Sequence, residues 1–149
     1  MPEIAVKGVI VDQDTFSKIA LVDELGNTRG KPPGWGFPGG EGFDEEQAKH
    51  ALIREAYEET GIVIKILDFL YERENEFVKG VKVKTLFFLC QALNNGDPER
   101  RVANETGGWK WFEINKLPEK TYYSHRTILE DGEGNTKNEI DALLWYHRP

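Results

Sequence analysis

The chain has 149 residues, of which 39% are hydrophobic and 30% are charged, and its formal net charge is −7. This length and composition predict one soluble globular domain over residues 1–149. The acidic balance argues against general binding to nucleic acid or to an anionic membrane surface. No apolar run is long enough to span a bilayer, and the N-terminal residues MPEIAVKG lack the pattern of a signal peptide, so a cytoplasmic location is expected. The single cysteine, Cys90, lies in the apolar run LFFLC and is expected to be buried.

The first 38 residues predict three strands and a loop that lead into a glycine-rich turn. Apolar residues predict strands at 4–11 and 18–22, joined as a hairpin across the turn DQDT. Residues 23–33 are expected to be loop, because they hold two glycines and the pair Pro32-Pro33. Residues 35–38 predict a short strand that brings the chain to Gly39 and Gly40.

A helix is predicted over residues 44–60. Asp44 followed three residues later by Gln47 is typical of a helix start, and Gly61 is typical of a helix end. Three glutamates, Glu55, Glu58 and Glu59, then fall at positions i, i+3 and i+4. They are therefore expected to share one face near the end of the helix.

This glutamate cluster is unfavourable for folding alone. Like charges at these spacings repel, and each anion near a helix C-terminus costs roughly 0.3–1 kcal/mol against the helix dipole. A bound cation would reverse both effects, and Mg²⁺ prefers carboxylate oxygens. The alternative is an ordinary acidic helix face in contact with solvent.

The remaining residues predict a mixed sheet completed by further helices. One or two strands are expected at 62–75 and a long, central strand at 81–93, followed by a loop at 94–108 and a short strand at 109–112. A helical turn is expected at 114–119, residues 122–129 are ambiguous, and DGEGN is expected to be a turn. A last helix at 136–147 would turn Ile140, Leu143 and Leu144 inward. These elements predict an α/β fold with a mixed sheet between helices, although they leave the strand order open.

The residues around the glutamates form a complete motif. Its seven fixed identities are Gly40, Glu46, Arg54, Glu55, Glu58, Glu59 and Gly61, with the aliphatic residues Ala56 and Ile62 at their expected places. This pattern is the Nudix box, and the chain therefore resembles the Nudix hydrolases, which cleave nucleoside diphosphates linked to another group. The resemblance implies an α/β/α sandwich and metal-assisted attack of water on a phosphorus of a pyrophosphate.

The resemblance also implies roles for the glutamates of the box. Glu55, Glu58 and Glu59 would bind divalent metal, with Mg²⁺ expected and Mn²⁺ as an alternative. Either Glu55 or Glu59 would also orient or deprotonate the attacking water. Arg54 would hold a glutamate through a bidentate contact, and Glu46 would orient Arg54 or add negative charge outside the metal shell.

The two glycines that open the box have roles of their own by the same resemblance. Gly39 and Gly40 would bring the backbone close to the metal, with the Gly40 carbonyl as a further ligand. Outside the box, Glu105 is the candidate for an additional acid, with an ordinary loop charge as the alternative.

Substrate contacts are less defined. Arg29 and Lys31 either contact a substrate phosphate or are solvated loop charges. Trp35 is a candidate for stacking on a base, together with Tyr71, Phe77 and Trp109, although core packing is expected for most of these aromatic residues.

The expected partner is a small nucleotide that contains a diphosphate, and a homodimer is compatible with this size. A proline shortly past the box marks relatives specific for ADP-ribose, but here the next proline is Pro98. A nucleoside triphosphate or a nucleotide sugar is therefore favoured as substrate. A nucleotide-sensing module without turnover is the alternative function, and a structural protein with an accidental acidic helix is a third.

Overall fold

A computed structural model describes residues 3–26, 32–41, 44–102, 105–130 and 136–147. The strands in these ranges are β1 (Glu3–Val11), β2 (Lys18–Glu24), β3 (Gly34–Gly36), β4 (Gly39–Glu41), β5 (Ile64–Val78), β6 (Val81–Ala92) and β7 (Thr106–Glu113). The helices are α1 (Ala48–Thr60), α2 (Tyr123–Leu129) and α3 (Thr136–His147). None of these helices is long and apolar enough to cross a membrane.

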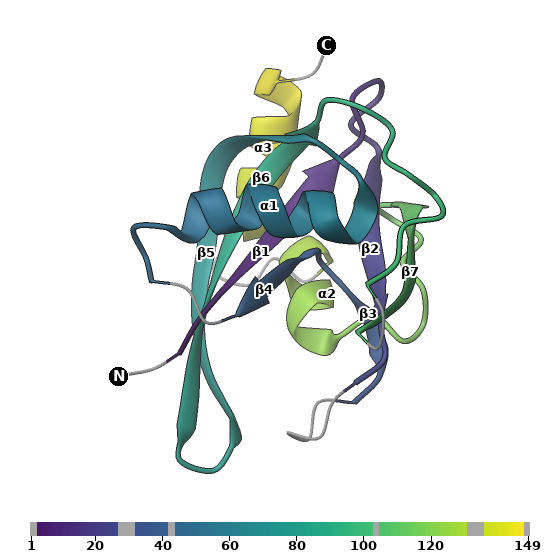
Figure 1. Cartoon of the computed structure of the whole chain (residues 1–149). Coiled ribbons are helices and arrows are strands. Elements are labelled where there is room, and N and C mark those ends of the chain that lie inside the picture. The colour runs from purple at the N-terminus through teal and green to yellow at the C-terminus, as the bar shows by residue number, and fades with distance from the viewer. Residues whose placement is uncertain (1–2, 27–31, 42–43, 103–104, 131–135, 148–149) are drawn as a thin grey trace.

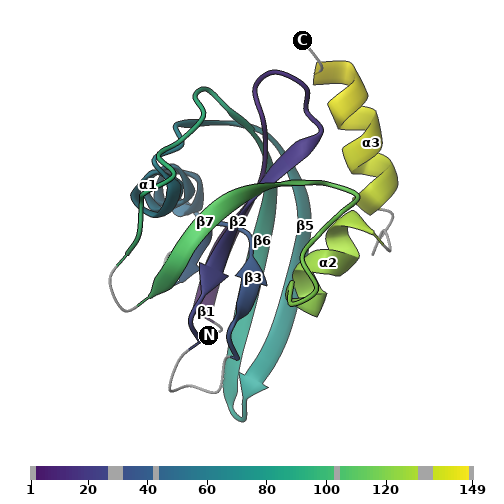
Figure 2. The ribbon, with the colours of Figure 1, turned by 90° about the vertical axis from the view of Figure 1, so that its right-hand side faces the viewer.

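The strands form one mixed sheet that lies between two layers of helix. Helix α1 covers one face, and α2 and α3 cover the other, as the side view shows (Figure 2). The sheet order is β3-β2-β1-β6-β5, in which β1 and β6 are parallel and the other neighbours in this order are antiparallel. The expected fold class is confirmed, and β6 is internal because β1 and β5 flank it.

The sheet forks between β1 and β2. Strand β1 pairs with β6 along one edge, whereas its other edge pairs with β2 at Val11 and with β4 at residues 5–7. Strand β2 pairs with β7 along one edge, and its other edge pairs with β1 at Ile19 and with β3 at residues 22–24. The two strands therefore diverge, with β4 along one arm of the fork and β3 along the other. Figure 1 shows β4 directly below α1.

The core has two parts, one on each face of the sheet. On the α1 face, Leu52 and Ala56 of the helix pack with Val6, Ile10 and Phe88 of the sheet, among others. On the opposite face the core joins the strands to α2 and α3. Its sheet and helix members include Val9, Phe87, Leu89, Ile128 and Ile140, with Leu143 and Leu144 packed against them. The inward orientation expected for the last helix is confirmed, and Cys90 is buried as expected.

The predicted start of the first helix is wrong by four residues. Residues 45–47 form a turn, and α1 begins at Ala48. The Asp44 carboxylate accepts a 3.0 Å hydrogen bond from the backbone N–H of Gln47, as a helix cap would, but this contact closes the turn that precedes the helix. Gly61 ends the helix as predicted, with a positive φ of 73°.

Other differences follow from long-range pairing. The helical turn expected at residues 114–119 is absent, because the Ile114 N–H donates to the Ser17 carbonyl at 3.0 Å and the chain continues into turns. The ambiguous segment 122–129 contains α2. Residues 106–108, expected to be loop, extend β7 along β2, and the box glycines form a strand of their own, β4. The predicted turn at 131–135 lies outside the described residues.

Candidate active site

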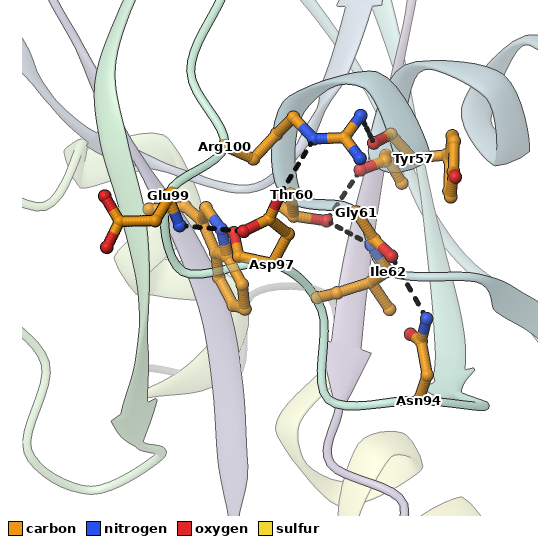
Figure 3. Close-up of polar contacts among 10 residues, drawn as sticks. Tyr57, Thr60, Gly61, Ile62, Asn94, Asp97, Glu99 and Arg100 are labelled. Atoms are coloured by element: carbon orange, nitrogen blue, oxygen red, sulfur yellow. Dashed lines mark hydrogen bonds and ion pairs between the residues drawn. The ribbon is translucent and has the colours of Figure 1, made fainter.

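The C-terminal end of α1 is closed by the loop that follows β6 (Figure 3). The Gly61 N–H donates to the Tyr57 carbonyl at 2.8 Å, and the Asp97 N–H donates to the Thr60 carbonyl at 2.8 Å. A Cβ atom at Gly61 would lie 2.8 Å from the Asp97 Cβ and 2.9 Å from its nitrogen. Position 61 therefore requires glycine for two reasons: its backbone has a left-handed conformation, and the loop approaches too closely for a side chain.

The same loop brings a cation and an amide to the helix end. Arg100 donates to the Tyr57 carbonyl at 3.3 Å and lies over the Tyr57 ring, and its Nε is 3.6 Å from the Asp97 carboxylate. The Asn94 side-chain N–H donates to the Gly61 carbonyl at 3.1 Å. These donors offset part of the negative charge at the helix end, which lowers the cost of placing glutamates there.

The three box glutamates differ in burial. The exposed fraction is 49% for the Glu58 side chain and 21% for that of Glu55, and Glu59 is only 8% exposed. Their helical spacing puts them on neighbouring positions as predicted, but Glu55 is only partly buried and Glu59 alone of the three is buried. The cluster therefore runs from solvent into the protein interior.

Arg54 connects the two outer glutamates. Its Nη1 atom lies 3.2 Å from the Glu55 Oε1 atom and 3.2 Å from the Glu58 Oε1 atom. Burial, followed by the negative charge of Glu58, raises the pKa of Glu55, while Arg54 acts in the opposite direction. Arg54 thus neutralises part of the charge on the outer side of the cluster.

Glu59 is held from the inner side. Its Oε1 atom accepts a 2.8 Å hydrogen bond from the Gly39 N–H. Burial, with smaller contributions from the charges of Glu24 and Glu55, raises the pKa of Glu59 to about 8, against the effect of Lys7 and of the hydrogen bond. A buried carboxylate of this kind exchanges a proton near neutral pH.

Gly39 lies tightly against β1. Its φ is 153°, and a Cβ atom there would be 1.9 Å from the Val6 carbonyl oxygen. In the β1–β4 pairing Gly39 is opposite Lys7 and Gly40 is opposite Val6. The first box glycine therefore allows the close backbone approach that brings its N–H to Glu59.

Two charged residues at this site were missed by the sequence analysis. Lys7 of β1 is buried, and its Nζ atom lies 3.8 Å from the Oε1 atom of Glu24 in β2. A signal for Lys7 was present, because it is a lone lysine inside the apolar run IAVKGVIV. Glu24 carried no such signal, since it comes at the edge of a polar loop.

The predicted residues outside the cluster lie at different distances from it. Glu105 is exposed just before β7, and its charge contributes to the raised pKa of Glu55, so its side chain lies within electrostatic reach of the cluster. Glu46 is exposed in the turn before α1. The ring of Trp35 packs against that of Phe112, with 5.0 Å between centroids, on the face that α2 and α3 cover.

The structure describes only some of the other residues predicted to contact substrate. Arg29 and Lys31 lie outside the described residues, as does the side chain of Phe77. Trp109 is buried and its ring N–H donates to the Asp97 carbonyl at 2.6 Å, which is a packing role. Tyr71 is partly buried beside Arg73.

The ligand atoms available near the cluster are carboxylate and backbone oxygens. Among the residues that the structure describes, no three Asp, Glu, His or Cys side chains are arranged as a group that could hold a metal ion. A cation here would thus draw only part of its coordination shell from these side chains.

Comparison with known proteins decides the family. Residues 1–132 match the family model of the NUDIX domain. The chain belongs to the Nudix family. The family expected from the box is thereby confirmed, and with it the enzyme class, a Nudix-type pyrophosphohydrolase. Nudix hydrolases generally need a divalent metal and act on small nucleotide substrates.

Individual relatives agree with this assignment. This Nudix chain is 27% identical over 133 residues to the ADP-ribose pyrophosphatase of Methanocaldococcus jannaschii. The match covers 87% of this chain and 72% of that protein. The MutT NUDIX hydrolase from Burkholderia pseudomallei superposes with a TM-score of 0.71 at 21% identity, covering 87% of this chain and 97% of that one. A NUDIX hydrolase from Nitrosomonas europaea gives a TM-score of 0.70 at 23% identity, with 91% of each chain covered. The two structures show that the fold is shared.

Proposed function

We propose that this Nudix chain cleaves the pyrophosphate bond of a nucleoside diphosphate linked to another group, in a reaction that requires Mg²⁺ or Mn²⁺. The observation that carries the proposal is the graded burial of Glu58, Glu55 and Glu59 at the capped end of α1. One side of this cluster is open to a charged substrate, and the other is anchored on the Gly39 strand.

The residues present fit a hard divalent cation. Mg²⁺ binds one or two protein carboxylates, keeps several waters and takes further oxygens from substrate phosphates. Glu55, Glu58 and Glu59 offer carboxylate oxygens and Gly40 offers its carbonyl, so a closed cluster of three side chains is not needed. When bound, the cation would supply positive charge to the pyrophosphate oxygens.

The protein's own residues would orient and deprotonate the attacking water. Glu59 is the favoured proton acceptor, because burial raises its pKa to about 8 and the Gly39 N–H fixes its orientation. Glu55 is the alternative, since burial also raises its pKa. Arg54 would keep Glu55 and Glu58 in position through its shared nitrogen.

The remaining predicted roles belong to residues farther from the core of the cluster. Glu46 would orient Arg54 or add negative charge at the start of the helix. Glu105 would assist as an additional acid, which its electrostatic effect on Glu55 supports. Arg29 and Lys31 are proposed as substrate contacts, whereas the packing of Trp35 against Phe112 on the α2 and α3 face favours a role in the core for that ring.

The substrate class remains a nucleoside triphosphate or a nucleotide sugar, with ADP-ribose as a further candidate. The name of the Methanocaldococcus jannaschii relative favours ADP-ribose. The lack of a proline between Ile62 and Pro98 favours the other two classes. All three are small molecules that contain a pyrophosphate, so one assay separates them.

The test is hydrolysis of a substrate panel by the purified chain. Nucleoside triphosphates, nucleotide sugars, ADP-ribose and dinucleoside polyphosphates are each incubated with Mg²⁺, Mn²⁺ or EDTA in ¹⁸O-labelled water, and the products are identified by mass spectrometry. We expect cation-dependent cleavage at a pyrophosphate, with the label in one product phosphate. Glu58→Gln should lower the rate by about 10²-fold or more.

Glu119→Gln is the matched control. Glu119 is an exposed glutamate in the turn before α2, the helix that covers the face of the sheet opposite α1. The Glu119→Gln variant should cleave the substrate at the rate of the unmodified chain. Nucleotide binding without turnover of any compound would instead support the sensing module.

A further inference from the structure

A buried ion pair crosses the fork of the sheet beneath the glutamate cluster. Lys7 comes from the β1 arm and Glu24 from the β2 arm, and their side chains are only 7% and 18% exposed. The Nζ to Oε1 distance is 3.8 Å. Because a buried ion pair often contributes little net stability, its presence at this point calls for a role besides folding.

The Lys7 ammonium lies among the carboxylates of the site. Burial alone would lower its pKa, yet the negative charges of Glu24, Glu59, Glu41 and Glu55 hold the pKa above its ordinary value. The effect is mutual, since Lys7 is the largest influence that favours the charged form of Glu59. Lys7 thus favours the charged form of the inner glutamate through its nearby positive charge, whereas Arg54 contacts the outer two glutamates directly.

The backbone of Lys7 is tied to the same glutamate. Lys7 is opposite Gly39 in the β1–β4 pairing, and the next residue, Gly8, donates its N–H to the Pro38 carbonyl at 2.9 Å. Gly39 in turn donates to Glu59 at 2.8 Å. Lys7 therefore supplies the positive charge that acts on the Glu59 carboxylate, and its backbone pairs with Gly39, which supplies the hydrogen-bond donor.

We propose that Lys7 is a positioning residue of the active site, whose ammonium, anchored by Glu24 across the fork, fixes the Glu59 carboxylate on the Gly39 N–H. This role rests on the proposed function, because the orientation of Glu59 matters to the enzyme only if that carboxylate takes part in the reaction. Lys7 is too buried to contact a substrate and acts through Glu59.

The test measures backbone amide hydrogen exchange by NMR in the metal-free protein. The double variant Lys7→Met with Glu24→Gln removes both charges of the pair together, so that neither partner is left alone in the interior. Lys7→Arg keeps the charge. The amide of Ala51, which donates to the Gln47 carbonyl at 2.9 Å in the first turn of α1, reports changes in stability away from Gly39.

In the double variant we expect exchange at Gly39 to become about tenfold faster or more, relative to exchange at Ala51. In Lys7→Arg the same ratio should stay close to that of the unmodified chain. On the substrate identified by the panel, kcat should fall while KM changes little. An unchanged ratio of Gly39 to Ala51 exchange would overturn the proposal. If both amides exchange faster by the same factor, the ion pair has a structural role alone.

The exchange measurement needs no substrate and no metal. If the unmodified chain cleaves none of the compounds in the panel, the proposed function fails, whereas the Gly39 exchange ratio still decides whether Lys7 positions Glu59. The two proposals can therefore fail separately.

Discussion

The backbone N–H of Gly39 donates a 2.8 Å hydrogen bond to the carboxylate of Glu59. This bond joins the start of β4 to the C-terminal end of α1. The two residues are 20 positions apart in the chain. This contact places the most buried glutamate of the cluster against β4, the strand that pairs with β1. It also joins the glycines of the motif to its glutamates by a direct hydrogen bond.

Gly39→Ala should destabilise the protein by about 2–4 kcal/mol, because the new Cβ atom would lie 1.9 Å from the Val6 carbonyl oxygen at a φ of 153°. Gly80→Ala is the control, since Gly80 also has a positive φ, 85°, but has nothing within 4 Å of the added Cβ. That change should cost only about 1–2 kcal/mol. Urea unfolding measures both, and equal losses would contradict the close approach at Gly39.

The metal-free protein should lose stability as the pH rises from about 4.5 to about 8. Burial raises the pKa of Glu59 from 4.5 to about 8, so the folded state binds a proton that the unfolded state releases within this window. The stability from the protonated form is fully present below pH 4.5 and is lost as the pH passes 8, by up to about 5 kcal/mol.

Urea unfolding with EDTA over this pH range measures the effect as the difference between the unmodified chain and Glu59→Gln. The amide cannot ionise, so the variant should lack this part of the slope. Parallel pH profiles for the two proteins would show that Glu59 keeps an ordinary pKa.

Mg²⁺ or Mn²⁺ should raise the midpoint of thermal unfolding. A ligand at 100 times its Kd stabilises the folded state by about 2.7 kcal/mol if it does not bind the unfolded chain. Glu58→Gln should reduce the shift, because it removes a charged oxygen ligand, and Glu119→Gln should leave it unchanged. Differential scanning fluorimetry with and without EDTA is sufficient, and no shift in the unmodified chain would favour an acidic helix without a metal.

Asn94→Ala should destabilise the protein by about 1–3 kcal/mol. The Asn94 side chain accepts from the Val63 N–H at 3.0 Å and donates to the Gly61 carbonyl at 3.1 Å, so both groups would lose a partner at the end of α1. Asn95→Ala is the neighbouring control, since Asn95 is exposed and its side chain accepts an exposed hydrogen bond from Gln13 at 3.2 Å. Similar unfolding midpoints for the two variants would argue against the cap.

Much of the local structure was predictable from the sequence, because it depends on neighbours along the chain. The positions of Glu55, Glu58 and Glu59 and the inward face of the last helix follow from helical periodicity, and the helix end follows from the left-handed conformation that Gly61 allows. The start of α1 was not predictable in this way, because the Asp44–Gln47 hydrogen bond forms equally well in a turn. The box motif also indicated the family, which the comparison confirmed.

Only the tertiary structure decided how these local elements combine. Strand order, the fork between β1 and β2, and the pairing of Lys7 with Glu24 depend on contacts between distant segments, which periodicity does not encode. The same is true of the loop that brings Arg100 to the end of α1. The sequence by itself determined which glutamates the box places near the end of α1, whereas the packing of α1 on the forked sheet determined that Glu59 is buried and Glu58 remains exposed, because burial is set by what lies opposite a side chain in space.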